Sequence, residues 1–97
     1  MTRGVVFRPQ AERELLDVQH WYEARREGLG NEFGAEVDEI VARIASTPLA
    51  FQRVRGDTRR GVLKRFPYAL YFRATSKEII VLAVHGRQDP SRWQTRS

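Results

Sequence analysis

The sequence predicts an α+β domain. An N-terminal strand and an antiparallel hairpin of two helices should pack on a small antiparallel sheet of three to four C-terminal strands. Two stretches between positions 10 and 47 carry apolar residues at helical spacing. After Pro48 the pattern changes to short strand-like runs, and the continuous apolar run 79–84 fits a central strand buried on both faces.

The first half of the chain holds the strand and the two helices. Val5–Arg8 is a short apolar strand, and Pro9 suits the first turn of a helix, where a missing N–H does no harm. One face of this helix is marked by Ala11, Leu15, Val18 and Tyr22. Gly28–Gly30 predicts a turn, and Asn31 is a suitable N-cap for the second helix. The buried face of that helix is marked by Phe33, Val37, Ile40 and Ile44, and it should end near Thr47.

The second half predicts the sheet, with a turn at Gly56-Asp57 and a hairpin loop at Thr75–Lys77. The expected strands are Phe51–Arg55, Arg60–Phe66, Tyr68–Ala74 and Ile79–Val84. Within the Arg60–Phe66 strand, simple alternation puts Leu63 and Arg65 on the face opposite Lys64. A cation facing an apolar layer needs a partner, so this strand is a candidate binding surface.

The composition fits one domain over residues 1–97. The chain has 41% hydrophobic and 30% charged residues and no Cys, so neither a disulfide framework nor a Cys-based metal site is expected. No apolar run is long enough for a signal peptide or a membrane span, and we expect a cytoplasmic protein. Two His without a close pair, and no Gly-rich phosphate loop after a strand, predict neither zinc nor a cofactor.

The charge is unevenly distributed along the chain. Residues 1–48 carry six Arg and nine acids, net −3, and residues 49–97 carry eleven Lys or Arg and three acids, net +8, which sum to +5. This asymmetry predicts a face that attracts an anionic partner, either nucleic acid or an acidic protein segment. The cations concerned are Arg53, Arg55, Arg59, Arg60, Lys64 and Arg65. Solvated strand edges that oppose aggregation are the alternative interpretation.

The segment 85–93 holds the other candidates. His85 suits a general acid or base near neutral pH, or else a hydrogen-bonded structural residue. Arg92 and Trp93 pair a cation with a flat ring that can stack on a base or a peptide, unless Trp93 packs on the core. The acids of the first helix, by contrast, resemble a solvated face; they are Glu12, Glu14, Asp17, Glu23 and Glu27.

These motifs together resemble the ParE/RelE toxin superfamily, and the ParE branch in particular. The resemblance covers nearly the whole chain: VVFRPQAERELLDVQHWYEAR at its start, then Arg60 through RFPYALYF (65–72), then VLAVHGRQDPSRW (81–93). It implies a helical hairpin on a small antiparallel sheet. It also implies a toxin of a plasmid-stabilisation or toxin–antitoxin system that arrests growth unless a cognate antitoxin wraps over it.

The ParE branch is linked to poisoning of DNA gyrase, and the RelE branch to cleavage of mRNA on the ribosome. RelE-type enzymes carry Tyr then Arg where this chain has Tyr68-Ala69, and a C-terminal Tyr where it has Trp93. The resemblance therefore favours a gyrase inhibitor over an mRNA interferase, whose weak catalytic candidates here are Arg65, His85 and Arg87. A basic binding domain without toxicity is the third alternative.

The resemblance and the charge pattern together assign two sets of contact residues. Contacts to the target are expected from Arg59, Arg60, Lys64, Arg65, Arg87, Arg92 and Trp93. Contacts to the antitoxin are expected from Leu63, Arg65, Tyr71 and Arg73. We expect a tight complex with the antitoxin, no metal and no membrane partner, with direct binding of nucleic acid as a less favoured possibility.

Overall fold

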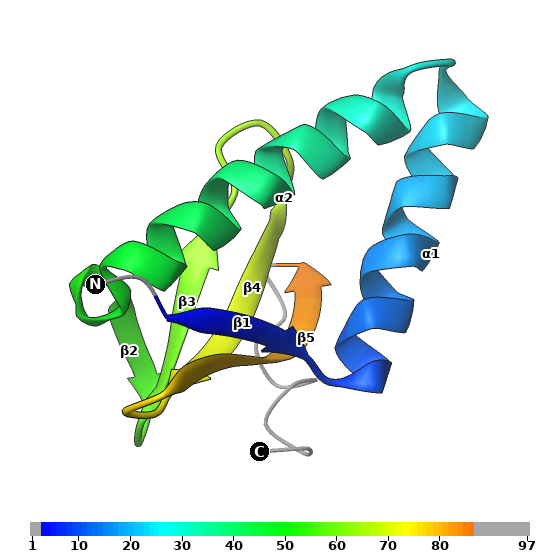
Figure 1. Cartoon of the computed structure of the whole chain (residues 1–97). Helices are drawn as coiled ribbons and strands as arrows, with labels where there is room; N and C mark the ends of the chain where they lie inside the picture. The colour runs from blue at the N-terminus through cyan, green and yellow to red at the C-terminus, as the bar shows by residue number, and fades with distance from the viewer. Residues whose placement is uncertain (1–2, 87–97) are drawn as a thin grey trace.

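The computed structural model describes residues 3–86 and confirms the α+β class (Figure 1). The elements in chain order are β1 (Gly4–Phe7), α1 (Pro9–Arg25), α2 (Leu29–Ser46), the short 3-10 helix η1 (Pro48–Ala50), β2 (Gln52–Arg55), β3 (Thr58–Val62), β4 (Tyr68–Ala74) and β5 (Glu78–Gly86). The strands form a single sheet in the order β1-β5-β4-β3-β2.

The N-terminal strand joins this sheet as an edge strand. β1 pairs with β5 in parallel, from Gly4 opposite Glu78 to Phe7 opposite Val81. The pairs β2–β3, β3–β4 and β4–β5 are antiparallel, as predicted. A parallel partner needs a long crossover connection, and here the rest of the chain between β1 and β5 supplies it. β1 covers only the first half of β5, so the second half of β5 needs other partners.

The two helices cover one face of the sheet. Figure 1 shows that they meet at the hairpin turn and diverge towards the sheet. The predicted apolar face of α2 is buried, with Phe33, Val37, Ile40 and Ile44 between 0% and 5% exposed. These side chains pack against Leu70 and Phe72 of β4 and Ile79 and Val81 of β5. Burial of this stripe supplies most of the drive that holds α2 on the sheet.

The start of α2 differs from the prediction. The helix begins at Leu29, with Gly28 as N-cap at φ 88°, so Asn31 lies in the first turn and is not the cap. Glu23 of α1 explains the difference, because its carboxylate accepts the N–H groups of Gly28 and Gly30, each at 2.9 Å. A carboxylate from the preceding helix therefore does the work of a local capping side chain.

The second strand of the C-terminal sheet is also shorter than predicted. β3 ends at Val62, and residues 64–67 form bends rather than strand. The expected alternation fails there, because Leu63 and Phe66 are both buried, 1% and 6% exposed, while Lys64 and Arg65 are exposed.

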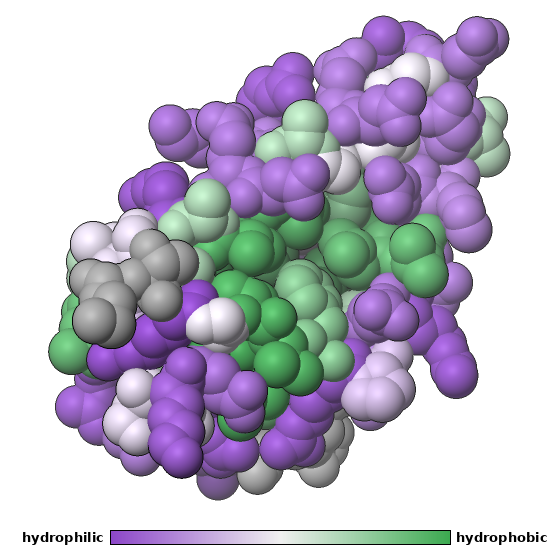
Figure 2. Space-filling view, in the orientation of Figure 1, coloured by the Kyte–Doolittle hydropathy of each residue, from purple (hydrophilic) through white to green (hydrophobic). Residues whose placement is uncertain are grey.

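A hollow lined by apolar residues opens between the helices. Figure 2 shows these residues gathered below α2 and above β1, with hydrophilic residues around them. Partly buried side chains that pack on the core from these elements are Val5, Phe7, Leu15, Val18 and Val41. All five side chains are only partly buried, so this apolar surface remains partly accessible.

Candidate functional site

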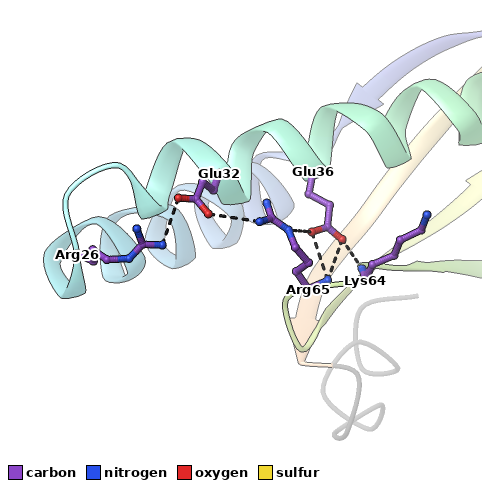
Figure 3. Close-up of polar contacts among 5 residues, drawn as sticks. All are labelled: Arg26, Glu32, Glu36, Lys64 and Arg65. Carbon is purple, nitrogen blue, oxygen red and sulfur yellow. Dashed lines mark hydrogen bonds and ion pairs between the residues drawn. The ribbon is translucent and has the colours of Figure 1, made fainter.

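The bend after β3 is held by a carboxylate from α2. Glu36, only 9% exposed, accepts the backbone N–H of Lys64 and that of Arg65, the latter at 3.2 and 3.3 Å from its two oxygens (Figure 3). These N–H groups have left the ladder because β3 has ended. A buried carboxylate that accepts backbone N–H groups makes charge-assisted bonds, which are stronger than neutral ones. Glu36 thus fixes the backbone that displays both cations.

The Arg65 side chain extends this network along α2. Its Nε lies 3.5 Å from Oε1 of Glu36, and its Nη1 lies 3.4 Å from Oε1 of Glu32. The other oxygen of Glu32 accepts from Arg26 at 3.2 Å. Arg65 remains 61% exposed, so these ion pairs orient the guanidinium without removing it from the surface. The predicted partner of this cation is therefore a pair of carboxylates on α2.

An aromatic cluster anchors the same bend from below. Phe66 contacts Tyr22 of α1 and Phe33 of α2, with ring centroids 4.8 and 5.2 Å apart. Tyr22 also approaches Tyr68 at 6.3 Å. Burial, and then the neighbouring Tyr68, raise the pKa of the Tyr22 hydroxyl above its ordinary value. Phe66 thus joins both helices to the start of β4.

A cavity of about 200 Å³ lies between α2 and the end of β3. Its walls include Glu36, Glu39, Ile40 and Arg43 of α2 and the segment 62–65. We call this cavity the β3 slot. Gly61 allows the close approach of α2 beside it, because a Cβ there would lie 3.0 Å from Ile40 Cγ1. The slot therefore has an apolar floor and a charged rim.

The other predicted cations of β3 are partly used within the chain. Arg59 donates to the carbonyl oxygens of Phe51, at 2.8 Å, and Leu49, at 3.4 Å. Arg60 donates to the Gln52 side chain at 3.4 Å. Because neighbours in a strand point to opposite faces, Arg59 and Arg60 do not form one patch. Lys64 and Arg65 are both exposed on the bend after β3, whereas Arg59 and Arg60 bond to residues 49–52.

The expected antitoxin contacts divide into two kinds. Leu63 is 1% exposed and Tyr71 is 0% exposed, because Leu63 packs in the main core and Tyr71 packs with Ala69 and Ala83 on the opposite face of the sheet. Their side chains are therefore not available for direct contact in this structure. Arg65 is exposed and Arg73 half-buried, so both can still meet a partner.

His85 lies at the end of β5, where β1 no longer covers the strand. It is 4% exposed, and its Nε2 lies 3.3 Å from Oε2 of Glu14. The other oxygen of Glu14 accepts the backbone N–H of Val84 at 2.9 Å. A depression of about 330 Å³ beside them is also lined by Asp17 and Tyr68. Glu14 therefore closes the open edge of β5 as Glu36 closes the end of β3.

The prediction of a solvated acidic face on α1 is wrong for two of its members. Glu14 contacts β5, and Glu23 caps α2. The sequence does carry a signal, because Glu14 lies within the stripe formed by Ala11, Leu15 and Val18. An acid inside an apolar stripe needs a partner in the core.

Three of the predicted site residues, Arg87, Arg92 and Trp93, lie outside the described residues. Over residues 3–86 there is no group of three His, Cys, Asp or Glu placed to hold a metal ion. In the same range, neither helix has the length and apolar character needed to span a membrane.

Solved structures share this arrangement. A structure described as the chromosomal ParDE TA system from P. aeruginosa matches with a TM-score of 0.73 and 18% identity, over 88% of this chain and 96% of the other. The toxin–antitoxin complex RelBE2 from Mycobacterium tuberculosis matches with a TM-score of 0.60 and 19% identity, over 90% of this chain and 100% of the other. At these identities the matches establish the fold, a helical hairpin on a small sheet.

The sequence itself places the chain in a family. Residues 5–90 match the family described as ParE toxin of type II toxin-antitoxin system, parDE. The chain therefore belongs to the ParE toxin family. Among curated protein sequences, none matches it significantly.

Proposed function

We propose that this chain is the toxin of a type II toxin–antitoxin pair in the cytoplasm, that it acts by binding DNA gyrase, and that a cognate antitoxin neutralises it. The family supports the toxin role. A binding mode of action is supported by one observation above others. His85, the residue with the best acid–base chemistry, is only 4% exposed, and its Nε2 faces Glu14 at 3.3 Å.

Position 69 supports the same proposal. RNA cleavage by a 2′-hydroxyl needs cations around the phosphate as well as an acid and a base. Ala69 stands where the resemblance to RelE enzymes would require Arg, and it is 0% exposed in the sheet. The accessible cations Lys64 and Arg65 lie on a rigid bend instead, which suits recognition of an acidic protein surface.

Besides the cations Lys64 and Arg65, the apolar hollow between the helices is a surface that the antitoxin can bind. The two solved relatives are described as a ParDE TA system and a RelBE2 toxin–antitoxin complex. The apolar hollow of Figure 2 can accept an amphipathic helix or strand through Val5, Phe7 and Val41. Apolar burial would supply affinity, and the +8 charge of residues 49–97 would attract an acidic antitoxin.

Gyrase supercoiling tests the proposed target. Purified chain should stop supercoiling of relaxed plasmid or trap cleaved DNA, and prior addition of the antitoxin should restore full activity. Unchanged supercoiling at a large excess of the chain would exclude gyrase as the target. Truncation after Asp89 should abolish inhibition and keep antitoxin binding if Arg92 and Trp93 contact the target.

The alternative target is the ribosome, since a RelBE2 complex shares the fold. In that case primer extension on translated mRNA should show new 5′ ends after induction, and Arg65→Ala should remove them. Intact transcripts in growth-arrested cells would eliminate cleavage. Normal growth after induction would instead support a basic binding domain without toxicity, and would contradict both toxin mechanisms.

A further inference from the structure

One end of β3 has a strand partner on one side only. β4 pairs with β3 as far as Val62, opposite Ala69, whereas β2 pairs with β3 only as far as Arg60, opposite Gln52. Leu63 donates its N–H to the carbonyl of Tyr68 at 3.0 Å. Because backbone groups alternate in direction along an antiparallel pair, the N–H and C=O of Val62 point away from β4. They point to the side that β2 leaves vacant.

The chain before β2 explains why this side is vacant. If β2 continued towards its N-terminus, Ala50 would lie opposite Val62. Residues Pro48–Ala50 instead form the helical turn η1. The β3 slot lies beside Val62, with α2 as its other wall. Its volume of about 200 Å³ is too small for a whole element, so only a short stretch of extended chain fits.

The charges around the slot favour an acidic occupant. Glu36 is already occupied by the N–H groups of Lys64 and Arg65 and by the Arg65 guanidinium. Arg43 lies on the rim, with its guanidinium 5.4 Å from the ring of Phe51. Within residues 3–86, the Lys64 ammonium has no ion pair. Glu39 is the remaining negative group, so cations exceed unused carboxylates at the rim.

We propose that the β3 slot binds a short, extended, acidic segment of the antitoxin. The segment would continue the position of β2, pair its backbone with the N–H and C=O of Val62, and place a carboxylate against Lys64. Backbone pairing gives affinity in such strand additions, and the flanking charge gives selectivity. This inference rests on the proposed function for the identity of the occupant, but the chemistry of the slot can be tested separately.

A defined peptide tests that chemistry. Isotope-labelled full-length chain is titrated with acetyl-Asp-Val-Asp-Val-Asp-amide and, in parallel, with acetyl-Lys-Val-Lys-Val-Lys-amide. The acidic peptide should shift the backbone amide signals of Val62 and Lys64, and the basic peptide should not. Shifts confined to β1 or to the outer edge of β2, or stronger binding of the basic peptide, would overturn the proposal.

Charge variants give the sign of the interaction. Lys64→Glu should weaken binding of the acidic peptide about fivefold, and Glu39→Lys should strengthen it by a similar factor, as expected for single rim charges. Arg55→Glu makes the same charge reversal on exposed β2, outside the slot, and should change affinity less than twofold. Equal weakening by Arg55→Glu and Lys64→Glu would reduce the effect to net charge and contradict a specific site.

The last experiment measures the affinity of the antitoxin for the same variants. The Kd of the complex should rise about fivefold or more with Lys64→Glu and stay nearly constant with Arg55→Glu. An unchanged Kd with Lys64→Glu, despite slot binding of the acidic peptide, would exclude the antitoxin as occupant. If no antitoxin relieves growth arrest, the proposed function fails, whereas loss of peptide binding at Val62 overturns the slot alone.

Discussion

Two ends of the sheet are closed by carboxylates from two different helices. Glu14 of α1 accepts the N–H of Val84 at the uncovered half of β5, and Glu36 of α2 accepts the N–H groups that follow β3. Both acids lie in the apolar stripe of their helix, three residues after a fully buried side chain, Ala11 or Phe33. In each case a helix carboxylate replaces a missing strand.

The two ends differ in what surrounds the carboxylate. Glu36 holds two backbone N–H groups and a 61% exposed Arg65, on a bend that displays cations. Glu14 holds one N–H group and His85, which is 4% exposed. The first arrangement positions charge for a partner, whereas the second keeps a polar side chain inside the fold. A helix carboxylate therefore holds an exposed cation on the surface at the end of β3, and a buried histidine inside the fold at the end of β5.

Glu36→Gln should have the largest effect on stability. Gln retains one acceptor, but its NH2 group then faces the Arg65 guanidinium, and the charge that strengthens two backbone bonds is lost. Because hydrogen bonds to charged groups contribute about 1.5–3 kcal/mol each, we expect a loss of about 3 kcal/mol in the free energy of unfolding. Urea denaturation followed by circular dichroism measures it.

Glu39→Gln is the matched control on the same helix. Glu39 is exposed and makes no ion pair among the described residues, so the change should stay within about 0.5 kcal/mol. Equal stability of the two variants would show that the bend after β3 does not depend on the carboxylate.

Gly30→Ala should have the second largest effect, because it alters the hairpin that positions both acids. A Cβ at Gly30 would lie 2.8 Å from the carbonyl oxygen of Gln19, a backbone atom that cannot move alone. We expect a loss of about 2 kcal/mol from overpacking, measured as a lower urea midpoint.

Gly34→Ala is the comparison one helical turn later. There a Cβ would meet only the Gln19 side-chain amide, at 2.7 Å from Nε2. That side chain can move only by giving up the hydrogen bond that it donates to the Gly30 carbonyl oxygen at 3.1 Å, but replacing Gly by Ala in a helix interior gains up to about 1 kcal/mol and offsets this loss. Gly34→Ala should therefore be close to neutral. A loss as large as that of Gly30→Ala would mean that the helices cannot adjust at either position.

The sequence predicted the helices and strands well where burial follows a simple period. The strand Tyr68–Ala74 has the predicted limits. The predicted apolar stripe of α2 is buried, and the helix ends at Ser46, next to the predicted Thr47. The early end of β3 was not predictable from alternation, because Glu36 captures the N–H groups of Lys64 and Arg65 from 28 and 29 residues away. Such a contact exists only once α2 lies on the sheet.

The candidate site shows the same limit. The sequence identified Lys64 and Arg65 as cations of interest, but it could not separate them from Arg59, which donates to backbone carbonyls near η1. It also named Leu63 as a contact residue, whereas this side chain is 1% exposed and packs in the core. Charge is visible in a sequence, but the partner that uses it depends on tertiary contacts.

Glu14→Gln should reduce stability less than Glu36→Gln or Gly30→Ala. It tests directly whether the two helix carboxylates differ in their contribution to stability. The Gln oxygen can accept the Val84 N–H, and its NH2 group can donate to His85 Nε2 if the imidazole is neutral with its proton on Nδ1. We then expect a loss below about 1 kcal/mol in urea unfolding at pH 8, because each hydrogen bond is replaced. A loss as large as that of Glu36→Gln would instead mean that His85 Nε2 carries a proton and needs the Glu14 carboxylate as its acceptor. In that outcome the carboxylate would matter equally at both ends of the sheet, and the difference between Glu14 and Glu36 would no longer hold.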